Sequence, residues 1–92
     1  MIHSFADEET RAVFLTGRSR RWGNVARAAT RRLQAIDYAT AVEDLLQPPG
    51  NRLEKLGGDR QGFWSIRIND QLRICFRWEN GDAWEVGIVD YH

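Results

Sequence analysis

Three side chains that can exchange protons or donate hydrogen bonds follow one another at the carboxyl end of the sequence: Asp90, Tyr91 and His92. Arg73 lies earlier, in a stretch where polar and apolar residues alternate. RNA cleavage without a metal needs a base that deprotonates the 2′-hydroxyl, a cation that stabilises the phosphorane and an acid that protonates the leaving 5′-oxygen. His92 can be the acid or the base, because its proton exchanges near neutral pH. Arg73 can hold the phosphorane through two parallel hydrogen bonds, so these residue types indicate phosphodiester chemistry.

The remaining roles leave alternatives open. Tyr91 can stack on a base or donate a hydrogen bond, and either Glu54 or Asp90 can be the general base. A histidine at the last position is more often a solvated terminus than a catalyst. Arginines that alternate along a strand are more often a solvated face, balanced here by nearby acidic residues at Glu79, Asp82 and Glu85. Spacing alone therefore does not choose between catalysis and surface.

Several other classes of chemistry have no support in the sequence. There is no Walker loop, no G-x-G-x-x-G motif and no His/Cys/Asp spacing typical of a metal site. The lone Cys75 excludes an internal disulfide and a cysteine-based metal cluster. We therefore expect neither a metal nor a cofactor. The longest apolar runs are only a few residues, which predicts no signal peptide, no membrane span and a cytoplasmic protein.

Cationic residues are concentrated in one part of a chain whose 13 basic and 13 acidic residues cancel. The segment 10–36 contains no carboxylate and seven arginines: Arg11, Arg18, Arg20, Arg21, Arg27, Arg31 and Arg32. A local excess of positive charge can bind a polyanion even when the net charge is zero. The planar guanidinium also matches phosphate geometry, although the base composition of the encoding genome explains the preference for arginine equally well.

The elements that must position these residues are clearest in the last third of the sequence. Apolar residues recur at every second position, and the pairs Asn69-Asp70 and Asn80-Gly81 interrupt the pattern, as is typical of an antiparallel meander. One face of this predicted sheet carries Arg67, Arg73 and Arg77. The other face is apolar and carries Trp64, Ile66, Ile68, Leu72, Ile74, Phe76, Trp78, Trp84, Val86 and Ile88.

The first half of the sequence predicts a short strand over 2–5 and then helices. Asp7 and Gly17 are suitable caps for the first helix, and Asn24 for the second. Residues 39–46 indicate a further helical turn or two, and the segment around Glu54 a short strand. The length predicts one domain, 1–92. We expect an α+β fold of two layers, in which two to three helices cover one face of an antiparallel sheet of about four strands.

Five stretches of the chain resemble the HigB branch of the RelE-type toxins: Ile2-His3-Ser4-Phe5, Asn51-Arg52-Leu53, Gly62–Ile68, Asn69–Ile74 and Val89-Asp90-Tyr91-His92. The resemblance implies a RelE-like fold and the toxin half of a bacterial type II toxin–antitoxin pair. Such toxins enter the ribosomal A site and cut messenger RNA there without a metal. The 2′-hydroxyl attacks, which leaves a 2′,3′-cyclic phosphate. The implied partner is a HigA-like helix-turn-helix antitoxin, through which alone the toxin contacts operator DNA.

The resemblance also assigns roles to individual residues. Arg73 matches the phosphate-stabilising arginine, Tyr91 and His92 match the carboxyl-terminal catalytic pair, and Asp90 matches an acidic residue beside them. This chain departs from the better-known pattern at two positions, with Glu54 in place of a histidine and Gly57 in place of a lysine. We therefore expect Glu54 to be the general base opposite His92, with Arg73 between them. The competing interpretation is that Glu54 is a surface residue.

Contacts with RNA or the ribosome are expected from polar and cationic residues in two parts of the chain. These are residues 55–71 and the Arg-rich segment, 10–36: Lys55, Arg60, Arg67, Asn69, Gln71, Arg18, Arg20, Arg21, Arg27 and Arg31. The Arg-rich segment can equally be the surface that the antitoxin covers. Two other functions remain open for the same fold. One is inhibition of a target such as DNA gyrase without nuclease activity, and the other is a degenerate antitoxin-binding module.

Overall fold

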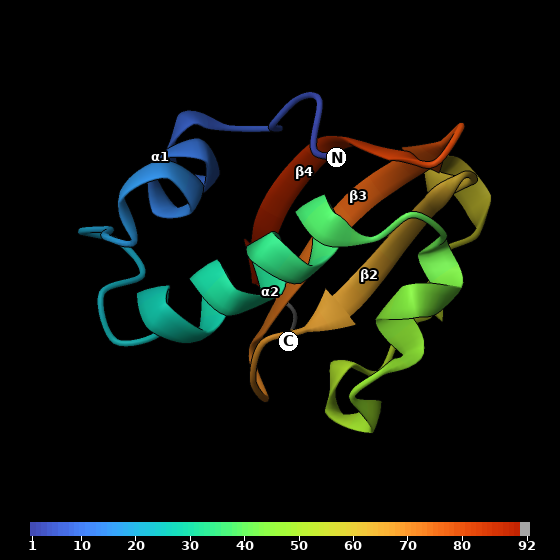
Figure 1. Ribbon diagram of the computed structural model, residues 1–92. Coiled ribbons are helices and arrows are strands. Elements are labelled where there is room, and N and C mark those ends of the chain that lie inside the picture. Colours follow the sequence, from blue (N-terminus) through green and yellow to red (C-terminus); the bar gives the residue numbers. More distant parts are fainter. Residues whose placement is uncertain (91–92) are drawn as a thin grey trace.

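A computed structural model describes residues 1–90 and contains two helices and a four-stranded sheet (Figure 1). The helices are α1 (Glu8–Thr16) and α2 (Ala26–Tyr38), and the strands are β1 (Glu54–Lys55), β2 (Phe63–Arg67), β3 (Leu72–Glu79) and β4 (Asp82–Asp90). Short 3₁₀ helices span Val42–Leu46, Pro49–Asn51 and Gly58–Arg60. All strand pairs are antiparallel, in the order β1-β2-β3-β4. The α+β architecture expected from the sequence is confirmed.

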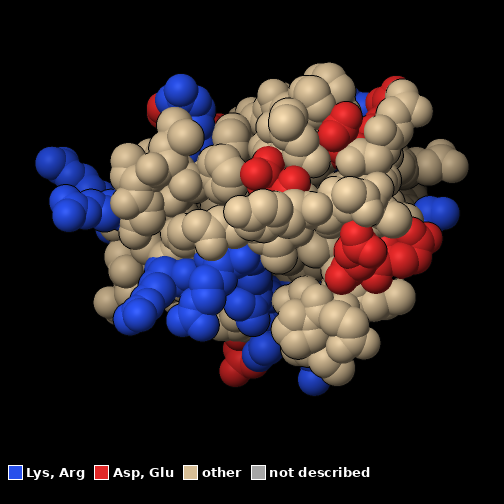
Figure 2. All heavy atoms as spheres, viewed as in Figure 1, with Lys and Arg blue, Asp and Glu red and all other residues tan. Residues whose placement is uncertain are grey.

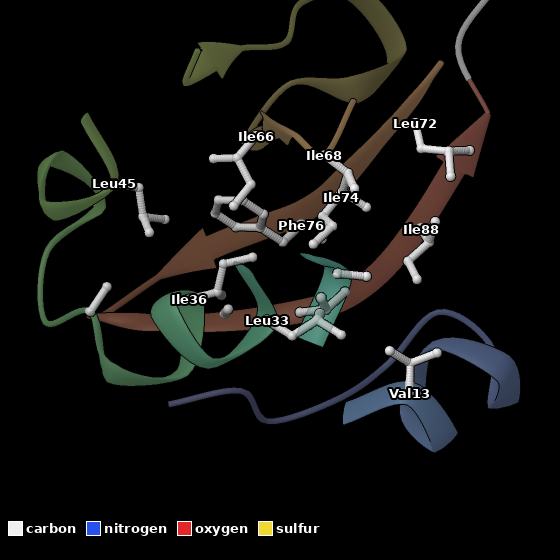
Figure 3. Packing of buried hydrophobic residues seen from close by; sticks show 14 of the residues in the cluster. Val13, Leu33, Ile36, Leu45, Ile66, Ile68, Leu72, Ile74, Phe76 and Ile88 are labelled. Atoms are coloured by element: carbon white, nitrogen blue, oxygen red, sulfur yellow. The ribbon is translucent and has the colours of Figure 1, made fainter. Parts of the chain in front are cut away.

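The hydrophobic core lies between α2 and one face of the sheet (Figure 3). Leu33 and Ile36 of α2 are fully buried, as are Ile66 and Ile74 of the neighbouring strands. The strand register places Ile66 opposite Ile74, which is the same-face pairing that the alternating sequence pattern predicts. This packing leaves Arg67 and Arg73, also opposite one another, on the other face.

The face expected for Trp84 is wrong, because a β-bulge interrupts the pairing of β3 and β4. Cys75 pairs with Gly87, whereas Arg77 pairs with Trp84, so that β4 contains one extra residue. One inserted residue reverses the faces of every residue beyond it. Trp84 therefore lies on the arginine face, where the Arg77 guanidinium carbon is 5.6 Å from its ring centroid, and Ala83 takes the buried position.

The caps expected from the sequence are observed at both ends of α1 but not at the start of α2. The Asp7 carboxylate accepts a hydrogen bond from the Thr10 amide at 2.7 Å, and Gly17 ends α1 in the left-handed conformation, with φ 72°. Asn24 was expected to cap the second helix, but the cap position is taken by Val25, one residue later, and α2 begins at Ala26. A turn closed by the Val25 amide and the Trp22 carbonyl (2.8 Å) occupies that position. Within the described part of the chain, no side chain caps the N-terminus of α2.

The outer edge of β4 is covered by the start of the chain. The strand expected over 2–5 is present as two isolated parallel bridges, Ile2 to Ala83 and Phe5 to Val86. Farther along β4, the Ile88 amide donates a hydrogen bond to the hydroxyl of Thr10, a fully buried residue, at 3.0 Å. This side chain therefore closes the edge of the sheet and fixes α1 against it.

Replacing Thr10 with valine is expected to lower the free energy of unfolding by about 1–3 kcal/mol, because the buried Ile88 amide loses its acceptor while the side-chain shape is kept. Urea unfolding followed by circular dichroism measures this change. Thr16→Val is the matched control, since that threonine is an exposed residue of the same helix. A Thr10→Val variant as stable as the unsubstituted chain would show that the Thr10 hydroxyl is unimportant.

Candidate active site

The guanidinium of Arg73 is held by hydrogen bonds to Ser65 and Arg52. Arg73 is only 8% exposed, in the middle of the arginine face. Its Nε donates to the Ser65 hydroxyl at 2.8 Å, and its Nη2 donates to the Arg52 carbonyl at 2.6 Å and to the Ser65 carbonyl at 3.4 Å. These three acceptors fix the plane of the guanidinium and leave Nη1 without a hydrogen bond to residues 1–90.

The Arg52 carbonyl reaches Arg73 because of the loop before β1. Arg52 adopts a left-handed conformation (φ 46°), which is uncommon for a residue with a side chain. The loop is held by the buried Asn51, whose amide donates to the carbonyls of Leu45 (3.2 Å) and Gln47 (3.1 Å). Residues far apart in the sequence thus build one rigid mount for the cation.

Glu54 lies at the rim of the same site. It pairs with Ser65 across β1 and β2, so its side chain shares the face of Arg73. Its Oε1 is 3.7 Å from Arg73 Nη1, the nitrogen that makes no hydrogen bond to residues 1–90. The Glu54 side chain is 56% exposed and that of Arg73 is 10% exposed. The Nη1 edge of this largely buried cation therefore lies beside an exposed carboxylate, which is the arrangement that a paired base and cation require.

The hydrogen bonds of Arg73 change one expectation. Two parallel bonds from this side chain to a phosphate were expected, but Nε and Nη2 already bond the protein. Nη1 can therefore donate a hydrogen bond to a phosphate oxygen while the hydrogen bonds from Arg73 to Ser65 and Arg52 are kept. Because Nη1 and Glu54 are not within hydrogen-bond distance of each other, a ligand oxygen competes with a weak contact rather than a strong one.

The expected carboxyl-terminal group is only partly described. Tyr91 and His92 lie outside the described residues. Asp90 pairs with Leu72, which is buried on the helix side of the sheet. The Asp90 carboxylate accepts a hydrogen bond from Nε2 of the Gln71 side chain at 3.1 Å. The register therefore does not bring Asp90 to the face of Arg73 and Glu54, although the chain leaves β4 one residue pair from Arg73.

The expected RNA contacts on the strands and on the 3₁₀ helix before β2 lie on two different faces of the sheet. Arg67 shares the face of Arg73 and forms an ion pair with Asp70. Arg60 lies over the ring of Phe63 on that face, with 5.2 Å between the guanidinium carbon and the ring centroid. Lys55 lies on the opposite face, because it pairs with Trp64, and its ammonium is 5.7 Å from the Trp64 ring centroid.

Polar residues of the β2–β3 turn lie beside the linker between the helices. The Asn69 side chain shapes this turn by accepting hydrogen bonds from the amides of residues 71 and 72, each at 2.8 Å. Together the turn and the linker form a hollow of about 400 Å³, lined by Arg20, Arg21, Trp22, Gly23, Asn24, Val25, Asn69, Gln71 and Leu72. The structure thus joins four of the expected RNA contacts in one place. Arg18, Arg27 and Arg31 are exposed and do not line this hollow.

Two members of the site were not found from the sequence. The Ser65 hydroxyl and the backbone carbonyl of Arg52 hold the guanidinium of Arg73. A serine side chain does not by itself indicate catalysis, and a backbone carbonyl is common to every residue. The one available signal is that Ser65 is a small polar residue on the arginine side of β2. Among residues 1–90, no three His, Cys, Asp or Glu side chains lie close enough to hold a metal ion. In the same range no helix is long and apolar enough to cross a bilayer.

The sequence matches a family of known proteins along almost its full length. Residues 3–92 match the model of the RelE-like toxin of type II toxin–antitoxin system HigB. The chain is 45% identical to Toxin HigB-1 of Vibrio cholerae over 60 aligned residues. The aligned region covers 65% of this chain and 63% of that protein. The chain is 46% identical over 61 residues to Endoribonuclease HigB of Proteus vulgaris, which is 66% of this chain and 65% of that protein. The chain thus spans just under two thirds of the length of these curated relatives.

The fold is similar to that of solved structures from Staphylococcus aureus. A chain of the heterotetrameric YoeB–YefM toxin–antitoxin complex superposes with a TM-score of 0.63, over 100% of this chain and 95% of that one, at 17% identity. The YoeB dimer gives a TM-score of 0.60, over 99% and 94% of the two chains, at 19% identity. At such low identity the likeness establishes the shared fold.

Proposed function

Because this chain belongs to the HigB family of RelE-like toxins of type II toxin–antitoxin systems, we propose that it is an endoribonuclease that cuts messenger RNA on the ribosome and so stops translation. The observation that carries the proposal is the fixed guanidinium of Arg73, whose Nη1 makes no hydrogen bond to residues 1–90 and lies 3.7 Å from Glu54 Oε1. A fixed cation stabilises a developing phosphorane without having to reorganise during the reaction. The relative named as an endoribonuclease supports the same activity.

The proposed reaction is a metal-independent transfer within the RNA. Glu54 removes the proton of the 2′-hydroxyl, and the 2′-oxygen forms a bond to the adjacent phosphorus. Arg73 Nη1 donates to the phosphorane oxygen that gains negative charge. His92 donates a proton to the 5′-oxygen as its bond to phosphorus breaks, and Tyr91 holds the neighbouring base. The products are a 2′,3′-cyclic phosphate and a free 5′-hydroxyl. In this assignment Asp90 orients the chain end that carries Tyr91 and His92.

The proposal includes two kinds of macromolecular partner. Cationic and polar residues around the site hold RNA through contacts to phosphates, which fix position without choosing sequence. The antitoxin is a HigA-like helix-turn-helix protein, and operator DNA is contacted only through it. The ribosome enters the proposal through the resemblance to RelE-type toxins, which act in the A site.

The test is to induce the chain in a bacterial host and to map the 5′ ends of its messenger RNAs. We expect new ends inside translated codons, and none when Arg73→Lys is induced to the same level. Intact messages together with a defect in DNA supercoiling would contradict the nuclease and indicate the gyrase-directed alternative. Growth and messages that both stay normal would indicate the degenerate antitoxin-binding alternative.

A further inference from the structure

The two outer strands of the sheet differ at their free edges. The edge of β4 is covered by the start of the chain, through the bridges of Ile2 and Phe5. At the other end of the strand order, no strand or bridge among residues 1–90 pairs with the outer side of β1. Both residues of β1, Glu54 and Lys55, are exposed. An uncovered edge presents unpaired backbone groups that a further strand can bind.

The hydrogen-bond ladder determines which backbone groups of β1 face outward. The Leu56 amide donates to the Phe63 carbonyl at 2.9 Å. In an antiparallel pair, residues that bond the neighbouring strand alternate with residues whose backbone groups point away from it. The backbone of Glu54, two residues before Leu56, therefore points toward β2, where Glu54 is opposite Ser65. The N–H and the carbonyl of Lys55 point away from β2, so they are the groups that a fifth strand can bond.

The side chains at this edge carry charges of both signs. Glu54 lies on the face of Arg73, and Lys55 lies on the opposite face, near the Trp64 ring. Elsewhere the two signs are separated. Figure 2 shows Lys and Arg gathered along one side of α2, whereas the largest group of carboxylates in that view lies over the Val42–Leu46 turn. The edge of β1 therefore does not select a polyanion such as RNA, and it suits a strand whose own charges alternate.

A second copy of this chain is a poor occupant of the edge. Two copies that pair antiparallel about a two-fold axis at β1 place the same residue of each copy opposite itself. The opposed side chains are then two copies of Lys55 or two copies of Glu54. Like charges directly opposite one another destabilise a strand pair. The edge is therefore protected against pairing with itself, whereas a strand with complementary charges can bind.

We propose that the open edge of β1 binds an extended segment of a partner protein as a fifth antiparallel strand. This segment has an apolar, an acidic and a basic residue in that order, from its N-terminus to its C-terminus. These residues lie opposite Leu56, Lys55 and Glu54, respectively. Directly opposite residues share a face, so each pair brings complementary side chains together. The backbone of the acidic residue exchanges two hydrogen bonds with Lys55, and such main-chain bonds give strand addition its affinity.

The bound segment also changes the active site. Its basic residue lies beside Glu54 on the face of Arg73. The Glu54 carboxylate, whose Oε1 is 3.7 Å from Arg73 Nη1, then has a second cation as its partner. A carboxylate beside an additional positive charge is a weaker base. The segment therefore inhibits cleavage. This consequence rests on the role proposed for Glu54, whereas the binding of the segment does not.

The test is the binding of a capped eight-residue peptide to the free protein, followed by NMR. The peptide has valine, glutamate and arginine at its centre, in that order, between threonines. We expect saturable binding and slower hydrogen exchange of the Lys55 amide. Exchanging the glutamate and the arginine should weaken binding about tenfold. N-methylation of the glutamate removes the N–H that faces the Lys55 carbonyl, and it should also weaken binding about tenfold.

Two variants of the chain separate the backbone of Lys55 from its side chain. Lys55→Pro removes the outward N–H and keeps the ladder with β2, because an edge strand tolerates proline where its N–H faces solvent. It should weaken binding about tenfold. Lys55→Ala keeps the N–H and should weaken binding only about threefold, through the lost charge. Circular dichroism checks that both variants are folded, and the N-methylated peptide tests the same main-chain bonds without any change to the protein.

The proposal is overturned if the peptide does not bind, or if it binds equally well after the charge exchange or after N-methylation. The binding measurement contains no RNA and so does not depend on the nuclease. Cleavage by the unsubstituted chain, with and without the peptide, is scored separately. Binding without inhibition would support the strand site and contradict the role of Glu54, whereas absence of cleavage in both samples would contradict the proposed function alone.

Discussion

Replacing Arg73 with lysine is expected to lower the rate of RNA cleavage by about 10²–10³-fold, the usual effect of removing one transition-state donor. Lysine keeps the positive charge but cannot donate to Ser65 and to Arg52 while presenting a third nitrogen outward, as Arg73 does. The lost feature is therefore the fixed direction of the donor. Single-turnover cleavage of a ribosome-bound message measures the change, and urea unfolding checks that the variant is folded.

Arg77→Lys is the matched control for this variant. Arg77 is on the same strand and the same face, but it pairs with Glu79 and Glu85 and lies over Trp84. These partners agree with the interpretation of a balanced surface that alternating arginines also allowed. The control should cut at the rate of the unsubstituted chain. Equal losses from the two substitutions would mean that Arg73 contributes only general positive charge to the face.

The second large effect is expected from Glu54→Gln, which removes the proposed base while keeping the size of the side chain. Loss of a positioned general base lowers the rate by about 10²–10⁴-fold. The same substitution removes the carboxylate 3.7 Å from Arg73 Nη1, so the cation no longer has this competitor for a phosphate. We therefore expect the catalytic rate constant to fall while the affinity for RNA rises.

This opposite movement of rate and affinity separates catalysis from structure. Glu79→Gln is the control, since that carboxylate pairs with Arg77 away from Arg73. Cleavage by Glu54→Gln at the normal rate would mean that the base is another group and that Glu54 is a surface residue.

The sequence was sufficient to predict β2 and β3 with their faces, because both strands continue without interruption. The alternation of Ile66 and Ile74 with Arg67 and Arg73 translates directly into a buried face and an arginine face. The alternation predicted the wrong face for Trp84 because of the bulge in β4. The bulge depends on how β3 and β4 pair, and the pattern along one strand carries no information on that pairing. The start of α2 failed for a similar reason, since a competing turn takes the residues of the expected cap.

Two side chains of the candidate site could be selected from the sequence, whereas the groups that hold them could not. Arg73 and Glu54 have side chains whose chemistry can be recognised, and the structure places them together. The mount of Arg73 depends on a backbone carbonyl 21 residues away, and a carbonyl has no sequence signature. The opposite faces of Glu54 and Lys55 follow from the register of a two-residue strand, which a pattern of that length cannot fix.

The proposed reaction at Arg73 and Glu54 has the 2′-hydroxyl of the RNA as its nucleophile. A message with a 2′-deoxynucleotide at the attacking position tests this reaction directly. On programmed ribosomes the purified chain should cut the all-ribose message, leaving a 2′,3′-cyclic phosphate, and should leave the substituted message intact at that position. Cleavage of the 2′-deoxy message at the same position would contradict the account, because the proposed nucleophile would then be unnecessary.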